Sequence, residues 1–187
     1  TKEKIVLQNF RIEGLSIKSC FQRMNYITAS MFEDIIKGEH SSIKEKEKNL
    51  TKFYYMAIRL IREYLQEGKY VQKDDMTLVK AMDYRLACEK LERLADELKN
   101  ISGKKTNEKV LKLAEKINQE YMKITSAFLN EDFEEAIKMW NKYKQYTKES
   151  IALEKKLKNE QSKEVLHSYM KVLEYIKDIS NLVRGKK

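Results

Sequence analysis

The chain has 187 residues, no proline, five glycines and a formal net charge of +9, and 36% of its residues are charged. Proline breaks helices and glycine weakens them, so their scarcity predicts an all-α protein. The length suits one domain, and no apolar run approaches the roughly 18 residues of a membrane span. Cys20 and Cys88 are too few for a zinc site or a disulfide framework, so we expect small core residues of a cytoplasmic protein.

Three helices are predicted in the first half of the chain, at residues 16–37, 42–67 and 74–101. Each begins at a residue whose side chain can cap a helix N-terminus: Ser16, Ser42, and Asp74 or Asp75. Gly38 and Gly68 are expected to end the first two helices, because glycine tolerates the left-handed conformation at a helix C-terminus. In residues 1–14, the run Ile5-Val6-Leu7 fits either a strand or the end of a preceding element.

Three more helices are predicted at residues 106–130, 132–157 and 162–183. Their expected caps are Thr106 or Asn107, Asp132 together with Glu135, and Ser162. Apolar residues at spacings of three and four mark the face that each helix buries. For the fifth helix, this face consists of Phe133, Ile137, Trp140, Tyr143, Ile151 and Leu157. Because short connections favour antiparallel neighbours, the six helices predict two tandem three-helix bundles.

Two carboxylate pairs stand out on the third and sixth predicted helices: Glu92 with Asp96, and Glu174 with Asp178. We call them the first and the second acidic ladder. Residues four apart are neighbours on a helix surface, and two like charges there repel by about 0.2–0.5 kcal/mol. A bound cation would turn this repulsion into attraction. The ladders are 82 residues apart (174 minus 92), and each adjoins an apolar stripe and is followed by an asparagine, which indicates an internal repeat.

The residues around the first ladder resemble the signature of the PhoU family of phosphate-uptake regulators. The run 81–102 contains Arg85, Leu91-Glu92-Arg93-Leu94, Asp96, Asn100 and Ile101 in the order of that signature. The upstream run 14–34 is similar to the opening helix of archaeal members. The resemblance covers nearly the whole chain and is most specific at residues 91–101. It implies one PhoU-like domain over residues 1–187, with half-repeats at about 16–102 and 106–184.

The resemblance also implies a metal site. In the family, acidic ladders of this kind bind metal clusters at the protein surface, and the matching residues here are Glu92, Asp96, Glu174 and Asp178. The cations implied are divalent or trivalent metal ions such as Fe, Zn, Mn or Mg. Further ligands in the family come from the middle helix of each bundle. In this chain the corresponding acids are Glu47, without a second acid at Thr51, and Glu149 and Glu154, which miss the spacing.

The function that the resemblance implies is regulation of phosphate uptake or phosphate signalling by a metal-binding helical adaptor. The implied partners are a phosphate transporter or a sensor kinase, and a homodimer is expected. Such a protein is at most peripheral to the membrane. The sequence has no Ser/His/Asp or Cys/His arrangement and no glycine-rich phosphate loop, so we do not expect an enzyme. Archaeal relatives often carry an AbrB-type DNA-binding domain ahead of the helices. A chain that begins at Thr1 fits a shortened version of that arrangement, which would connect it to DNA and to transcription regulation.

Three other interpretations come from the residues themselves. The net charge allows a basic bundle that binds nucleic acid directly, although the lysines are interleaved with glutamates. A structural or oligomerisation bundle with decayed ladders is another. Glu164 and His167 match one half of a di-iron motif, but the second half is absent from the sequence. Arg85 is expected either to contact an anion or to pair with Glu89 one turn away.

Overall fold

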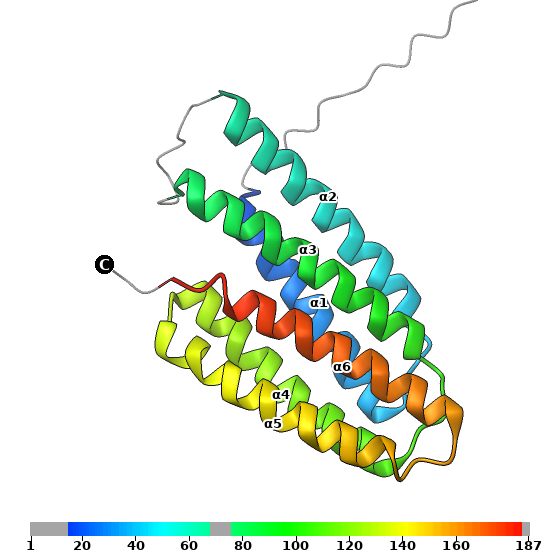
Figure 1. Ribbon diagram of the computed structural model, residues 1–187. Helices are drawn as coiled ribbons and strands as arrows, with labels where there is room; N and C mark the ends of the chain where they lie inside the picture. Colours follow the sequence, from blue (N-terminus) through cyan, green and yellow to red (C-terminus); the bar gives the residue numbers. More distant parts are fainter. Residues whose placement is uncertain (1–14, 68–75, 185–187) are drawn as a thin grey trace, which may run out of the picture.

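A computed structural model describes residues 15–67 and 76–184, which form helices connected by turns and short loops. The prediction of an all-α fold is confirmed over these residues (Figure 1). None of the helices in these two ranges combines the length and the apolar character needed to cross a bilayer. The helices are α1 (Ile17–Lys37), α2 (Ile43–Glu67), α3 (Leu78–Ile101), α4 (Glu108–Asn130), α5 (Phe133–Glu154) and α6 (Glu160–Ser180).

The ends of α1 follow directly from the sequence. The Ser16 hydroxyl accepts a hydrogen bond from the Ser19 backbone N–H at 3.0 Å, and the Ser16 N–H donates to Ser19 Oγ at 2.8 Å. Two donors that a helix N-terminus leaves unpaired are thereby satisfied. Gly38 ends the helix with φ of 78°, a left-handed conformation that favours glycine. Both predicted boundaries are confirmed, as are the caps at Asn107 and Asp132.

Two other predicted caps are wrong. Thr77 caps α3 by accepting the Lys80 N–H, whereas Asp74 and Asp75 lie outside the described residues. Asn159 caps α6, and its Oδ1 accepts the N–H of Ser162, which was the predicted cap. Ser162 is instead buried inside the first turn. Each region offers two or more capping side chains, so the local sequence alone does not determine where the helix begins.

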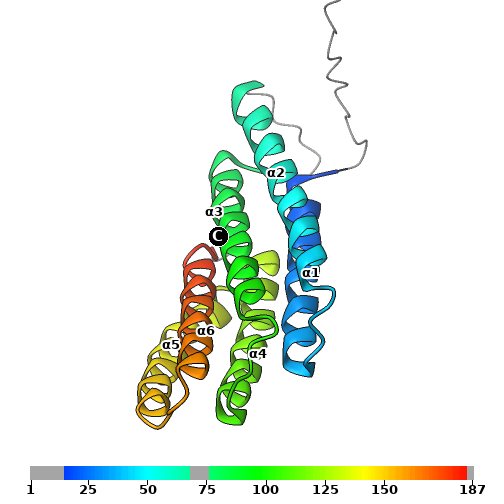
Figure 2. The same cartoon turned by 90° about the vertical axis from the view of Figure 1, so that its right-hand side faces the viewer.

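The helices pack in a regular order. α1, α2 and α3 contact one another, α4, α5 and α6 contact one another, and the two sets meet through α3 with α6 and through α1 with α4. Figures 1 and 2 show α3 and α6 side by side, with α2 and α5 beyond them on opposite sides. Among the described helices, α5 contacts α4 and α6 and no other, so much of its surface faces outwards.

Buried residues of all six helices form one hydrophobic cluster that crosses between the two sets. Phe21 of α1, Tyr84 of α3 and Phe128 of α4 meet with ring centroids 4.9–5.6 Å apart. Such aromatic contacts add about 0.5–1.5 kcal/mol beyond the burial of their area. Cys20 and Cys88 are fully buried and unlinked, as predicted.

The buried face of α5 differs from the prediction. Phe133, Ile137, Trp140 and Ile151 remain about half exposed, at 49%, 52%, 49% and 50%, although they were expected in the core. Tyr143 is half-buried, and Leu157 is buried but follows the end of the helix. The face that packs against α4 and α6 consists of Ala136, Met139, Tyr146, Ser150 and Leu153. We call the outer row of apolar residues the α5 stripe; it consists of Phe133, Ile137, Trp140 and Ile151.

Candidate functional site

The first acidic ladder lies where α3 packs against α2. Glu92 and Asp96 are both partly exposed on α3, and Glu47 of α2 adjoins them. Partial burial raises the pKa of Glu92, and the negative charges of Asp96 and Glu47 raise it further, against the opposing effect of Lys99 and Arg93. The register of α2 on α3 therefore gathers three carboxylates, one of them from the middle helix of its set.

A lysine lies among these carboxylates. Lys99 Nζ donates to Asp96 Oδ1 at 2.8 Å and lies 3.1 Å from Glu47 Oε1. The hydrogen bond to Asp96 raises the pKa of Lys99 despite its partial burial, and Glu47 adds to this effect. Thr51 Oγ1 donates to the same Glu47 oxygen at 3.3 Å. The ammonium group therefore supplies the positive charge that the ladder needs.

The second acidic ladder has different neighbours. Asp178 Oδ2 lies 2.8 Å from Lys90 Nζ of α3, while Glu174 is exposed. Together with Lys171 and Glu97, which pair at 2.9 Å, this contact joins α6 to α3. The second ladder thus faces the other set of helices, whereas the first faces a helix of its own set.

The acids of α5 do not reach the second ladder. Glu149 pairs with Lys116 of α4 at 2.7 Å, and Glu154 lies 2.7 Å from His167 Nε2. Lys177 of α6 approaches aromatic rings of α5 instead, with its Nζ 4.8 Å from the centroid of Tyr143 and 5.9 Å from that of Trp140. These are cation–π distances.

The carboxylate oxygens of the two ladders are candidate ligands for a metal ion. Carboxylate oxygens are the donors that hard cations prefer. As the side chains lie, however, lysines engage Asp96, Glu47 and Asp178. No group of three or more His, Cys, Asp or Glu side chains in ranges 15–67 and 76–184 has a geometry that could hold a metal ion. The donor chemistry fits a cation, but the present side-chain positions do not.

Three further residues, Arg85, Glu164 and His167, have ordinary surface partners. Arg85 Nη1 donates to Glu89 Oε2 at 3.1 Å, which agrees with the ion pair rather than the anion contact. Its guanidinium also lies 5.9 Å from the ring centroid of Tyr54. Glu164 pairs with Lys104, while His167 contacts Glu154, so these two residues have separate partners.

One small cavity, of about 80 Å³, lies at the end of the molecule where α3, α4 and α6 meet α1. Two of its basic residues are already paired: Lys80 Nζ is 2.6 Å from Glu131 Oε1, and Arg184 Nε is 2.6 Å from Asp83 Oδ2. Sites for small-molecule ligands usually enclose about 300–1,000 Å³. Its small size and the pairing of two of its three cations therefore do not favour an anion or substrate site here.

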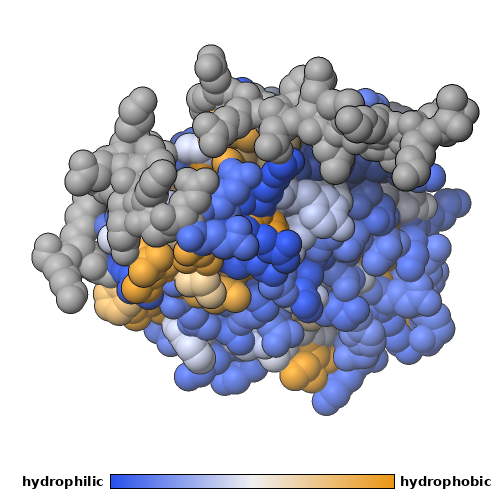
Figure 3. All heavy atoms as spheres, turned by 90° about the horizontal axis from the view of Figure 1, so that it is seen from above, coloured by the Kyte–Doolittle hydropathy of each residue, from blue (hydrophilic) through white to orange (hydrophobic). Residues whose placement is uncertain are grey.

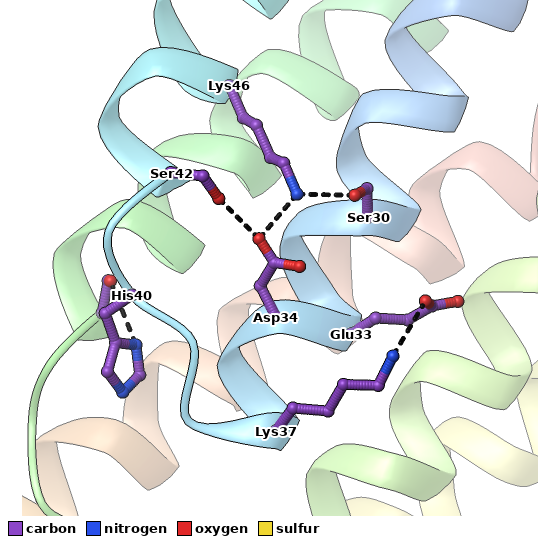
Figure 4. Close-up of polar contacts among 8 residues, drawn as sticks. Ser30, Glu33, Asp34, Lys37, His40, Ser42 and Lys46 are labelled. Carbon is purple, nitrogen blue, oxygen red and sulfur yellow. Dashed lines mark hydrogen bonds and ion pairs between the residues drawn. The ribbon is translucent and has the colours of Figure 1, made fainter.

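A polar cluster that the sequence did not predict closes the turn between α1 and α2 (Figure 4). Asp34 Oδ2 accepts from Ser42 Oγ at 2.7 Å and from Lys46 Nζ at 2.6 Å, and the same ammonium donates to Ser30 Oγ at 2.6 Å. Burial raises the pKa of Asp34, but the hydrogen bonds from Lys46 and Ser42 and the nearby lysine charges outweigh it, so the net pKa is lowered. We call these four residues the α1–α2 latch.

The latch is expected to make the stability of the fold depend on pH. Asp34→Asn is expected to lower the free energy of unfolding by about 1–3 kcal/mol at neutral pH, because it removes the charge from a partly buried, hydrogen-bonded acid. Since the folded pKa of Asp34 lies below its unfolded value of about 3.9, the stabilisation is present above that pH. It is lost as the pH falls through the folded pKa. Urea titrations of wild type and variant at several pH values measure the difference.

The matched control is Glu33→Gln on the same helix. Glu33 pairs with Lys37 at 3.6 Å, and both side chains are about 60% exposed, so less than about 1 kcal/mol is expected. If Asp34→Asn and Glu33→Gln had the same small effect at every pH, the latch would not contribute to stability.

Comparison with known proteins adds no family. No family model, no curated protein and no solved structure matches this chain. The resemblance to PhoU regulators thus depends on the residues quoted for it and remains a prediction.

Proposed function

We propose that this protein is a helical adaptor of the PhoU type, two tandem three-helix bundles that regulate phosphate uptake or phosphate signalling through contacts with another protein. The run 91–101 and the packing of the helices in two sets of three support the proposal. One observation carries it. Glu47, from the middle helix of the first set, lies beside Glu92 and Asp96, where the resemblance predicts a further ligand.

Metal binding at the first ladder is part of this proposal. Glu47, Glu92 and Asp96 would hold a cation such as Fe, Zn, Mn or Mg, which would supply a positive charge that bridges α2 and α3. Because Lys99 contacts Asp96 and Glu47, its ammonium must leave before a cation can bind. This competition predicts weak binding in the wild-type protein. The second ladder, with Lys90 on Asp178, is proposed as the weaker of the two.

Lys99→Met provides the decisive test of this site. Removing a unit charge a few ångströms from the carboxylates is expected to strengthen binding of Mn²⁺ or Zn²⁺ by about tenfold or more, since such a pair interacts by several kcal/mol at an effective dielectric constant near 20. Equilibrium dialysis followed by elemental analysis measures the affinity. Glu92→Ala/Asp96→Ala should abolish binding, and Glu174→Ala/Asp178→Ala should leave most of it. Equal metal content in all four proteins would remove the assignment.

The partner is tested separately. Binding of the purified chain to the ATPase subunit of a phosphate transporter, and to a phosphate-responsive sensor kinase, can be measured by biolayer interferometry with proteins from the same source. Binding to either supports the adaptor function, and binding to neither contradicts it.

Direct binding to nucleic acid remains the alternative proposal. Many described lysines pair with acids, among them Lys112 with Glu108 and Lys163 with Glu160, so negative charges are interspersed with the positive ones. A salt titration of duplex DNA binding separates the two proposals. Tight binding with a steep negative salt slope would favour the alternative.

A further inference from the structure

The α5 stripe is an apolar row on the outer side of the bundle. Its residues recur at spacings of three and four, with one wider interval of eleven positions before Ile151. Each is about half exposed. The stripe spans about 27 Å at a rise of 1.5 Å per residue. Viewed from above, the molecule shows hydrophobic surface gathered in patches among hydrophilic atoms (Figure 3). Exposed apolar rows rimmed by polar residues mark interaction sites.

Lysines occupy the interval within the stripe. Lys144 and Lys148 follow Trp140 by one and two helical turns, and both are exposed. They have no ion-pair partner within the described ranges. Of the acids later on α5, Glu149 pairs with Lys116 and Glu154 with His167. The row is thus apolar at both ends and positively charged between them, and burying it requires opposite charges.

The stripe lies along the edge that α5 shares with α6. Lys177 of α6 is close to the Trp140 and Tyr143 rings, so an aromatic and a basic group adjoin the row on this side. Its narrow shape, one helix wide, matches the apolar face of another helix, which presents residues at the same spacings.

We propose that the α5 stripe docks an acidic amphipathic helix of a partner protein. The apolar face of that helix would cover Phe133, Ile137, Trp140 and Ile151, and its Asp or Glu residues would pair with Lys144 and Lys148. The inference goes beyond the proposed function, because α5 carries no ladder residue and the docking needs no metal.

Two other occupants fit the stripe less well. A two-fold contact with a second copy would place Lys144 and Lys148 of both copies in one interface, with no acid on the stripe to neutralise them. An anionic membrane fits less well, because a bilayer accommodates a broad apolar face better than a row one residue wide.

Trp140 is the only tryptophan of the chain, so its fluorescence reports on this surface directly. Two synthetic peptides of about 18 residues serve as probes, matching the length of the stripe. Both carry leucines at spacings of three and four; one has glutamate at the other positions and one has lysine. The acidic peptide is expected to shift the Trp140 emission to the blue and to saturate, and the basic peptide is expected to have no effect.

Charge reversal makes the test specific. In Lys144→Glu/Lys148→Glu the acidic peptide is expected to bind at least about tenfold more weakly, since two ion pairs are replaced by repulsion, and the basic peptide should now bind. Ile137→Ser should weaken binding of the acidic peptide and should not allow the basic peptide to bind. The matched control is Lys44→Glu/Lys48→Glu, which reverses two exposed lysines at the same spacing on α2 and should leave binding unchanged.

Four results would overturn the inference. They are no shift with the acidic peptide, equal shifts with both peptides, a shift only with vesicles of phosphatidylserine and phosphatidylcholine, and an emission that depends on protein concentration alone. The last two would assign the stripe to a membrane or to self-association. Circular dichroism of each variant verifies that its helix content is unchanged.

Discussion

Met139→Asp is expected to unfold the protein or to lower its free energy of unfolding by more than about 4 kcal/mol, whereas Ile137→Asp, two residues earlier on α5, should change it by less than about 1 kcal/mol. Met139 is 1% exposed and faces α4 and α6, but Ile137 is 52% exposed. A carboxylate at position 139 would lose its hydration without gaining a partner. A carboxylate at position 137 would remain in water.

The measurement is urea unfolding of the two variants, followed by far-UV circular dichroism. A folded domain is stable by only about 5–15 kcal/mol, so the expected loss at Met139 is a large part of the total. If the effects were reversed, with Ile137→Asp the damaging change, α5 would bury the face that its sequence predicts. The α5 stripe would then not be at the surface.

The sequence predicts the wrong face of α5 because both faces are apolar. Met139, Tyr146 and Leu153 recur at a spacing of seven, and Phe133, Ile137 and Trp140 recur at spacings of four and three. Periodicity cannot choose between two such rows. Contacts with other helices determine which of the two rows is buried. Ala136 is small enough to let α5 approach its neighbours closely, and the Tyr146 hydroxyl reaches Glu120 Oε1 of α4 at 3.4 Å.

Helix ends were predictable wherever a region offers one strong signal. Ser16 and Gly38 are such signals, and both mark the ends of α1. Where capping residues compete, as Asn159 and Ser162 do before α6, local chemistry is satisfied by either choice. In the structure Asn159 caps α6, and Ser162 is buried in its first turn.

The ladders show how far a local pattern defines a site. The stacking of Glu92 on Asp96 follows from the helix repeat, and the Lys99–Asp96 pair is one of the standard spacings on a helix. The positions of Glu47 beside the first ladder and Lys90 on the second depend on how α2 and α6 pack against α3. The α1–α2 latch likewise joins residues eight and twelve positions apart across a turn. Residue spacing alone does not predict these contacts between helices.

Phe21→Ala is expected to lower the free energy of unfolding by about 3–5 kcal/mol and to do so for both sets of helices together. Phe21 is fully buried on α1, and its ring contacts Tyr84 of α3 and Phe128 of α4, so its removal leaves a cavity where the two sets meet. Trp140 lies in the second set, on α5. Its fluorescence therefore reports the unfolding of a set to which Phe21 does not belong.

Two probes read the same experiment. Far-UV circular dichroism follows all helices, and Trp140 fluorescence follows α5 alone; for a single cooperative unit the two urea midpoints coincide and shift equally in Phe21→Ala. Tyr26→Ala on the same helix is the control, because Tyr26 is 73% exposed and should have little effect. A Trp140 midpoint that stays at the wild-type value while the helix signal shifts would contradict the expectation. In that case each set would unfold on its own, and the shared aromatic contacts would not couple them.

A joint shift would mean that docking on α5 and cation binding at α3 act on one folding unit. A ligand at either surface would then stabilise the whole protein by mass action.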